Sequence, residues 1–339
     1  MSSISKIGVI GAGAWGTALA KHLAEKGLEV RLWAYEADVV ASINAVHENV
    51  RFLKGIPLPP RLTATTSLAE AVTNRQGLLF ATPSHVARSV LRRLASSVST
   101  PLPFICVSKG IEEETAKLMT QVMEDELPSS THQALMVLSG PSFASELGDG
   151  KPTAVCLAGP DKTLVQHFQQ TLMTPAFRVY ADTDMIGVQL GGALKNVMAL
   201  AAGVIDGLEL GLNARAALIT RGLAEIIRLG VAMGADPRTF YGLSGVGDLV
   251  LTCTGTLSRN HSVGVRLGKG ESLEAIVGGM QAVAEGVRTA RAALTLAHRH
   301  QVEMPIIQEI NAVLYDGKPC AKAVRDLMER DAKPEKGWS

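Results

Sequence analysis

The chain has 339 residues, a length that suggests two domains of ordinary size, and 47% of its residues are hydrophobic while 19% are charged, as in a folded protein with a well-buried core. A formal net charge of +1 argues against a protein held to nucleic acid or to a membrane surface by bulk electrostatics. The four cysteines form no CxxC pair and no zinc-like cluster with histidine, so we predict no metal site and reduced thiols in a cytoplasmic protein.

The N-terminal half alternates short apolar strands with helices. Residues 6–11 (KIGVIG) predict a strand, residues 15–26 a helix that Gly27 ends, and residues 29–33 a second strand. Further strands are predicted at 78–83, 104–109, 135–140, 153–159 and 177–182. We therefore expect an α/β Rossmann-type doubly wound sheet, mostly parallel, in residues 1–184. The first strand begins so early that we expect no signal peptide.

The strand signals stop after about residue 184. Alanine, leucine and glycine at helical spacing dominate residues 185–234. Further helices are predicted near 259–268, 271–277, 285–300, 304–315 and 319–330. We therefore expect an all-α C-terminal domain at 185–330 and a polar tail at 331–339. The most apolar run, around 186–205, contains Gln189, Lys195 and Asn196, so we expect a buried helix and no stable membrane insertion.

A glycine motif follows the first predicted strand and opens the first predicted helix. Gly11, Gly13 and Gly16 match G-x-G-x-x-G, in which the glycines permit a tight turn, close approach of a pyrophosphate and close packing of helix on strand. The alternative is a purely structural glycine turn. The context favours a dinucleotide, NAD or NADP.

The residues that would bind the cofactor ribose follow the second strand. Glu36, with Tyr35 beside it, stands where an acid would bind the ribose 2′-hydroxyl of NAD, although it could equally be a solvated residue of a helix's first turn. Arg31 is nearby but lies inside the strand, so the sequence leans to NAD and leaves NADP open.

Two predicted strands end in polar sequences at the sheet edge where doubly wound folds bind ligands. Ser108, Lys109 and Gly110 follow one strand, and residues 139–144 (SGPSFA) follow another. A lysine or serine there could bind an anionic substrate, while ordinary turn composition is the alternative.

The helical half contains two polar clusters. Residues 243–249 (LSGVGDL) include Asp248, and Thr252 follows it by one helical turn. Ser258 is a candidate N-cap with Arg259 and Asn260 in the first turn, where the helix dipole disfavours a cation unless an anion binds. Arginine can grip a phosphate with two hydrogen bonds, so we predict a phosphate site, the alternative being an exposed arginine.

Lys195 lies among small and apolar residues in the run 191–203 (GGALKNVMALAAG). One explanation is a lysine whose head reaches water along the surface. The other is a buried amine whose pKa is adjusted for general acid–base work, with Asp248 as its charge partner. A nearby carboxylate raises the pKa of a lysine while burial lowers it, so the direction of the net shift stays open.

Six motifs together resemble one enzyme family over nearly the whole chain. These are GAGAWG at 11–16, SKGI at 108–111, SGPSFA at 139–144, ALKN at 193–196, LSGVGDL…TC at 243–253 and SRN at 258–260. They are similar to the NAD(P)-dependent glycerol-3-phosphate dehydrogenases of bacterial type. The resemblance implies a homodimer and reversible hydride transfer between sn-glycerol 3-phosphate, which feeds phospholipid synthesis, and dihydroxyacetone phosphate.

The resemblance also implies roles for individual residues. Lys195 matches the proton donor and acceptor, with Asn196 as its neighbour and with Asp248 and Thr252 as its supports. The substrate is expected against Lys109, Gly140, Ser142, Lys195, Asp248, Ser258, Arg259 and Asn260. The cofactor is expected against Gly11, Gly13, Ala14, Trp15, Gly16, Tyr35, Glu36, Lys109, Ala144, Arg259, Val283 and Glu285. Ala14 departs from the family, whose members often carry serine there.

Two rival functions remain. A related β-hydroxyacid-type dehydrogenase would act on a carboxylate substrate, and the candidate phosphate grip at Arg259 distinguishes the two. A non-enzymatic nucleotide sensor would need no proton-transfer group such as Lys195.

Overall fold

The N-terminal part of the molecule contains one eight-stranded sheet. A computed structural model describes residues 3–98, 101–280, 284–332 and 334–335. The strands lie in the order β10-β9-β8-β7-β6-β1-β2-β5. Their bounds are β1 Lys6–Ile10, β2 Glu29–Trp33, β5 Leu62–Thr65, β6 Leu78–Phe80, β7 Phe104–Cys106, β8 Leu135–Ser139, β9 Thr153–Ala158 and β10 Phe177–Asp182.

The sheet is parallel except where β8 meets β9. β1 pairs with β2 on one side and with β6 on the other, so the chain order changes direction beside β1. In doubly wound sheets this switch point is where ligands bind, beyond the carboxyl ends of the strands. β9 runs antiparallel to β8, a reversal that the sequence did not indicate, and β5 and a small hairpin of β3 Glu48–Asn49 and β4 Leu53–Pro57 were also missed.

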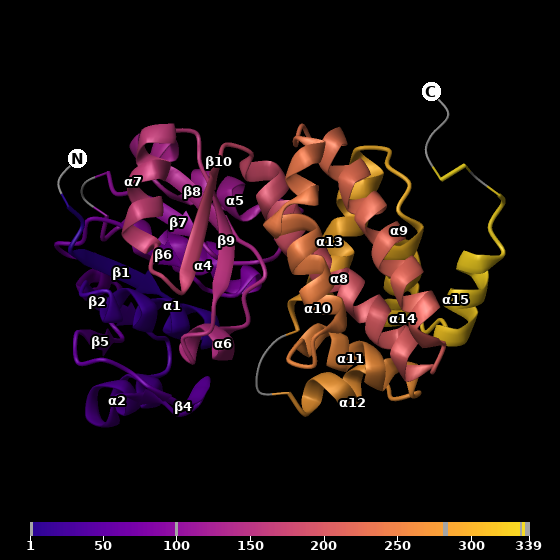
Figure 1. Cartoon of the computed structure of the whole chain (residues 1–339), viewed down its shortest axis with the longest axis horizontal. Helices are drawn as coiled ribbons and strands as arrows, with labels where there is room; N and C mark the ends of the chain where they lie inside the picture. The colour runs from indigo at the N-terminus through magenta and orange to yellow at the C-terminus, as the bar shows by residue number, and fades with distance from the viewer. Residues whose placement is uncertain (1–2, 99–100, 281–283, 333, 336–339) are drawn as a thin grey trace.

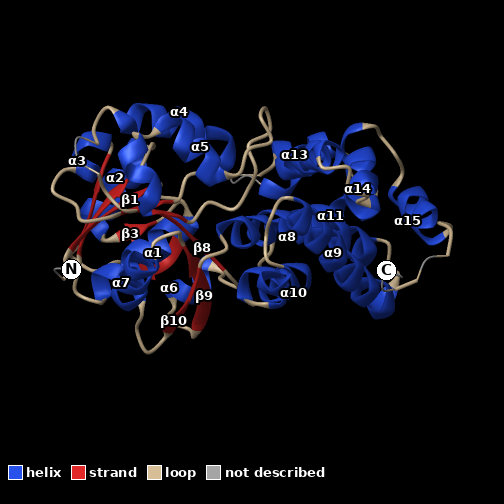
Figure 2. Cartoon of the chain, turned by 90° about the horizontal axis from the view of Figure 1, so that it is seen from above, coloured by secondary structure: helices blue, strands red, loops and turns tan. Residues whose placement is uncertain are grey.

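Helices cover both faces of the sheet because successive strand residues point to opposite sides. Ile7 and Val9 belong to one core cluster, which includes residues of α1 and α7, whereas Ile10 and Phe80 belong to another, which includes residues of α3, α4 and α5. Figure 2 shows α4 and α5 on one side of the strands and α1, α6 and α7 on the other. The bounds are α1 Ala14–Glu25, α2 Ala37–Val46, α3 Leu68–Val72, α4 Ser84–Ala95, α5 Met119–Glu126, α6 Ala144–Gly148 and α7 Lys162–Leu172.

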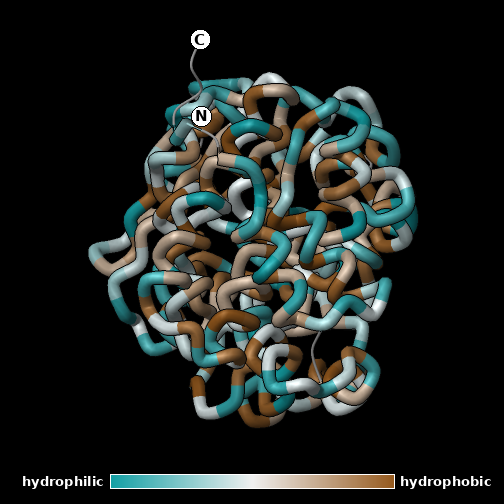
Figure 3. The backbone as a smooth tube through the Cα atoms, turned by 90° about the vertical axis from the view of Figure 1, so that its right-hand side faces the viewer, coloured by the Kyte–Doolittle hydropathy of each residue, from teal (hydrophilic) through white to brown (hydrophobic). Residues whose placement is uncertain are grey.

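The C-terminal part is helical and is arranged around α8 (Figure 1). Its helices are α8 Met185–Gly207, α9 Gly211–Ala232, α10 Asp248–Thr254, α11 Arg259–Gly268, α12 Leu273–Gly278, α13 Glu285–Arg299, α14 Pro305–Tyr315 and α15 Cys320–Met328. The end-on view in Figure 3 shows hydrophobic and hydrophilic stretches alternating along these helices, as amphipathic packing requires. The predicted fold class, a Rossmann-type sheet followed by helices, is confirmed.

α8 is the central helix of this part. Within the described residues it is the one helix long and apolar enough to cross a membrane, and its apolar stretch is completely buried inside the protein. The expectation of a buried core helix is therefore confirmed. The predicted helical stretch 185–234 is interrupted before α9, where Glu209 has a positive φ of 57°.

Candidate active site

The glycine loop lies at the switch point, and each of its three glycines has its own environment. Gly11 has a φ of +118°, which favours glycine, and a Cβ on Gly16 would lie 2.0 Å from the Gly11 carbonyl oxygen. A Cβ on Gly13 would meet nothing within 4 Å, so this residue faces open space. The first and third glycines thus close the turn and pack the helix, while the second leaves room for a pyrophosphate at the N-terminus of α1.

The other predicted cofactor residues in this part surround the same loop. Ala14, Trp15 and Ala144 are partly buried against one core cluster, and the buried Trp15 Nε1 has no hydrogen-bond partner in the described part of the chain. Glu36, the N-cap residue of α2, comes three residues after the end of β2, and Tyr35 is 77% exposed. The Gly11 N–H donates to the Trp33 carbonyl at 3.0 Å, so the end of β2 lies beside the loop. The positions of these residues around the glycine loop are consistent with a site for a dinucleotide.

Lys109 joins the sheet to the helical part. It follows β7, and its Nζ donates to the Gly140 carbonyl at 2.9 Å, to the Ser142 hydroxyl at 3.3 Å and to Asp248 Oδ2 at 2.8 Å. Gly140 has a φ of +151°, and a Cβ there would lie 2.9 Å from Val155 Cα. Three residues predicted to line the substrate therefore meet. The pairing of Lys109 with Asp248, across 139 residues of sequence, was not foreseen.

Lys195 and Asp248 form a buried ion pair at this junction. Lys195 Nζ donates to Asp248 Oδ1 and, at 2.9 Å, to Thr252 Oγ1. Thr252 Oγ1 in turn donates to the Asp248 carbonyl at 2.7 Å. Asp248 is completely buried and Lys195 is 7% exposed, so the alternative of a lysine reaching out to water is wrong. The single carboxylate of Asp248 is thus paired with the amino groups of both Lys195 and Lys109, so positive charge is in excess when both amines are protonated.

Burial lowers the pKa of the Lys195 amine to about 7. Attraction to Asp248 raises this pKa and repulsion from Lys109 lowers it, so desolvation together with Lys109 outweighs the carboxylate. The net shift in the pKa of Lys195, whose direction the sequence left open, is therefore downward. An amine with this pKa exchanges protons readily near neutral pH, as a general acid and base must.

The predicted phosphate grip lies at the start of α11. Ser258 is the N-cap, and its hydroxyl accepts a hydrogen bond from the His261 N–H at 3.2 Å, as predicted. Arg259 is an exposed residue, and its guanidinium makes no hydrogen bond or ion pair with any residue that the structure describes. Surrounding protein still lowers its pKa by desolvation, against attraction to Glu285. A cation held without a partner in a helix's first turn can receive an anion.

Asn196 and Asn260 connect three helices around this position. Asn260 Nδ2 donates to Asn196 Oδ1 at 3.0 Å, and its Oδ1 accepts from the Gly286 N–H at 2.9 Å. α8, α11 and α13 are thereby linked beside Lys195. These contacts occupy much of the hydrogen-bonding capacity of Asn260, so its direct contact with substrate remains a prediction.

Glu285 begins α13 and contacts the sheet domain. Its carboxylate accepts from the Ser84 N–H at 3.3 Å and from the Ser84 hydroxyl at 2.5 Å, and burial raises its pKa. Ser84, just after β6, was missed because nothing in its local sequence distinguishes it. Thr82 and Ser139, at two strand ends, also have buried hydroxyls without a partner among the described residues. Val283 lies outside the described residues.

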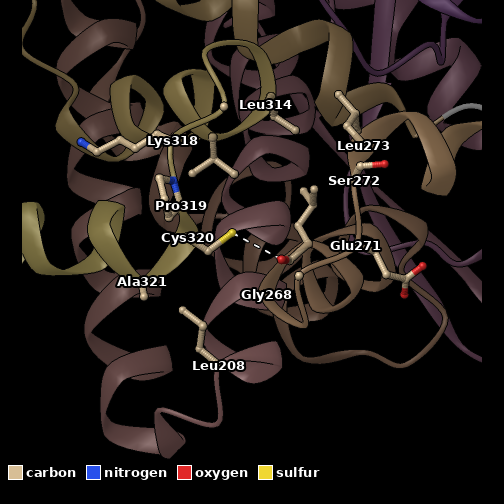
Figure 4. A pocket seen from close by; sticks show the side chains of 14 residues that line it. Leu208, Gly268, Glu271, Ser272, Leu273, Leu314, Lys318, Pro319, Cys320 and Ala321 are labelled. Carbon is tan, nitrogen blue, oxygen red and sulfur yellow. Dashed lines mark hydrogen bonds between the residues drawn. The ribbon is translucent and has the colours of Figure 1, made fainter.

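A separate hollow of about 480 Å³ lies in the helical part. Figure 4 shows it between the residues that follow α11 and the start of α15, where the Cys320 thiol donates to the Leu267 carbonyl at 3.5 Å. None of the predicted site residues lines it. The described residues contain no group of three or more His, Cys, Asp or Glu side chains placed to hold a metal ion.

Comparison with known proteins gives one consistent result. Family models described as the N-terminus and the C-terminus of NAD-dependent glycerol-3-phosphate dehydrogenase match residues 6–165 and 184–325. A glycerol-3-phosphate dehydrogenase (NAD(P)+) of Geobacter sulfurreducens is 53% identical over 331 residues, covering 98% of this chain and 99% of the relative. A glycerol-3-phosphate dehydrogenase structure from Coxiella burnetii has 38% identity and a TM-score of 0.92, covering 96% of this chain and 99% of that one.

A more distant structure shares only the fold. The structure of a probable 2-dehydropantoate 2-reductase from Bacillus subtilis matches with 16% identity and a TM-score of 0.58. The Rossmann sheet, the glycine loop and the amine at its edge define an NAD(P)-dependent oxidoreductase. Within that class, the full-length identities above are decisive. The chain belongs to the NAD-dependent glycerol-3-phosphate dehydrogenase family.

Proposed function

We propose that the chain catalyses the reversible, NAD(P)-dependent interconversion of sn-glycerol 3-phosphate and dihydroxyacetone phosphate, with Lys195 as proton donor and acceptor. The observation that carries this proposal is the buried Lys195 amine, whose pKa near 7 suits proton transfer and which is held at the junction of the two domains. We divide the chain at residue 184, between β10 and α8.

The cofactor supplies or takes up the hydride at the ketone carbon when bound. Gly13 and the N-terminus of α1 would hold its pyrophosphate, Glu36 its ribose, and Trp15 and Glu285 would lie near it. Because Glu36, the N-cap residue of α2, has no basic residue next to it in the sequence, the site would accommodate an unphosphorylated ribose.

Lys195 acts on the oxygen of the reacting carbon. In reduction, negative charge develops on the substrate oxygen, and the Lys195 ammonium stabilises that charge and then donates its proton. In oxidation the neutral amine accepts the hydroxyl proton. Asp248 and Thr252 each hold Nζ, which leaves its third hydrogen free to face the substrate.

The charges around Asp248 favour the developing oxyanion. When Lys195 is protonated, it and Lys109 carry two positive charges against the single carboxylate, and the three side chains are largely buried. The excess positive charge acts in a medium of low dielectric constant, where it is worth more than in water. Lys109 also donates to the Gly140 carbonyl, so the turn at Gly140 is connected through Lys109 and Asp248 to Lys195.

Arg259 binds the phosphate in this proposal, with Ser258 and Asn260 holding the helix turn that presents it. A phosphorylated substrate supplies the anion that the unpaired guanidinium lacks. A carboxylate could do the same, so the choice of a phosphorylated substrate rests on the family match. The presence of a proton-transfer amine argues against a nucleotide sensor. We further propose a cytoplasmic homodimer that supplies glycerol 3-phosphate for phospholipid synthesis.

The test is steady-state oxidation of NADH and of NADPH, measured separately, with dihydroxyacetone phosphate as substrate. Turnover with either establishes the reaction, and the ratio of the two efficiencies shows whether Glu36 selects the cofactor. Ketopantoate serves as the carboxylate control. Turnover with ketopantoate alone, or with neither substrate in a protein shown to be folded, would overturn the substrate assignment.

A further inference from the structure

The two helices that carry the ends of the proposed site pack backbone against backbone. α8 carries Lys195, and α11 begins with Arg259. Their closest backbone contacts involve Gly203 and Gly207 on α8 and Gly264 and Gly268 on α11, which we call the glycine seam. A Cβ on Gly264 would lie 2.1 Å from the Leu200 carbonyl oxygen, and a Cβ on Gly203 would lie 2.1 Å from the His261 carbonyl oxygen.

The backbones of the two helices are almost as close at Gly207 and Gly268, the second pair of glycines in the seam. A Cβ on Gly207 would lie 2.4 Å from the Val265 carbonyl oxygen, and a Cβ on Gly268 would lie 2.7 Å from the Val204 carbonyl oxygen. In protein structures a Cβ atom does not approach a backbone atom to less than about 3 Å, because the two atoms repel each other at shorter distances. Any side chain in the seam would therefore push the two helices apart.

Polar contacts prevent the helices from sliding along the seam. Asp206, near the end of α8, contacts His261 Nε2 at 2.8 Å and accepts from Arg215 Nη1 of α9 at 2.9 Å. At the other end, Asn260 Nδ2 of α11 donates to Asn196 Oδ1 of α8 at 3.0 Å. The position of α11 relative to α8 is thus fixed both in distance and in register.

We propose that the glycine seam sets the distance between the Lys195 amine and the Arg259 guanidinium and thereby selects substrates by the length of chain between the reacting carbon and the phosphate. The proposal rests on the function proposed above, in which these two groups bind opposite ends of the substrate. A substrate bound at both ends fits only if its length matches the distance between the Lys195 amine and the Arg259 guanidinium. A displacement of about 1 Å in such an arrangement costs on the order of a hundredfold in rate.

The test compares dihydroxyacetone phosphate with 1-hydroxybutan-2-one 4-phosphate, whose phosphate is one methylene further from the ketone. The variant is Gly264→Ala. We expect its kcat/KM for dihydroxyacetone phosphate to fall roughly 10- to 100-fold, while the efficiency with the longer analogue falls less or rises. The ratio of the two efficiencies does not depend on how much of the protein is active, and the KM for NADH should stay near the wild-type value.

The matched control is Gly278→Ala. Gly278 ends α12 in the same domain, and a Cβ there would meet nothing within 4 Å, so the wild-type ratio is expected. An equal loss with both substrates in Gly264→Ala would show a merely structural role and overturn the proposal. If that variant does not fold, Gly268→Ala, where the overlap is smaller, decides in the same way. Absence of wild-type turnover with dihydroxyacetone phosphate would instead refute the proposed function.

Discussion

Replacing Asp248 with asparagine changes the charge of the site while keeping its shape. The carboxylate is completely buried and contacts both Lys109 Nζ, at 2.8 Å, and Lys195 Nζ. It is the group that raises the pKa of Lys195 against burial and against repulsion from Lys109. Asp248→Asn removes this attraction and leaves two ammonium groups without a counter-charge.

The size of the effect follows from the contact. An opposite charge within about 4–6 Å shifts a pKa by roughly 1–3 units. Its loss should lower the pKa of Lys195 from about 7 by that amount. At pH 7 the wild-type amine is about half protonated, and a pKa lower by 1–3 units leaves an ammonium fraction of roughly 0.1 to 0.001, so reduction should slow by roughly 5- to 500-fold.

The assay is kcat/KM for dihydroxyacetone phosphate, measured between about pH 5 and pH 9 in wild type and variant. The rate of reduction requires the ammonium, so it declines as pH rises through the pKa, and that decline should move to lower pH in the variant. The position of the decline is independent of the amount of active protein. Asp236→Asn, which alters a surface pair with Arg238, is the control. A decline that stays in place, or moves to higher pH, would refute the reasoning.

Three further predictions concern other parts of the molecule. Arg259→Ala should raise the KM for dihydroxyacetone phosphate far more than that for NADH, with Arg259→Lys partly restoring it, whereas equal changes in both KM values would contradict a phosphate grip. Gly13→Val should weaken NADH binding without lowering the melting temperature, because a side chain there meets open space; unchanged binding in a titration would count against the loop as a pyrophosphate site. Burial raises the pKa of Glu225, whose carboxylate accepts from the Ile306 N–H, to about 7, above the unfolded value of 4.5. A carboxyl group with a raised pKa stabilises the fold fully below pH 4.5, and that contribution is lost as pH rises through 7. The unfolding free energy of wild type should therefore fall by roughly 3 kcal/mol over this range relative to that of Glu225→Gln. If urea unfolding gave wild type and Glu225→Gln the same pH dependence, the raised pKa of Glu225 would be excluded.

The local chemistry of the site could be predicted from the sequence. The glycine loop is recognisable because its spacing and its place between a strand and a helix are local features, although the close approach of Ala81 to Gly11 and Gly16 is not. Ser258 was identifiable as an N-cap for the same reason, since the cap contacts a residue three positions away. The buried helix containing Lys195 followed from its apolar run.

Long-range arrangements could not be predicted. The pairing of Lys109 with Asp248 depends on how the two domains meet, and it contributes to the direction of the pKa shift at Lys195. The reversal of β9 beside β8 depends on pairing across the sheet and has no local signal. Ser84 acquires its importance only from Glu285, some 200 residues away in the chain.

The measurement that tests the central claim most directly is turnover of Lys195→Ala, combined with NADH binding to the same preparation. Loss of the proton donor and of its charge should lower kcat by about 100- to 10,000-fold while NADH still binds. Lys21→Ala is the matched control, because Lys21 is equally buried, at 7% exposure, but lies in α1 paired with Glu25, and it should keep its turnover. Turnover of Lys195→Ala near the wild-type rate would contradict the account.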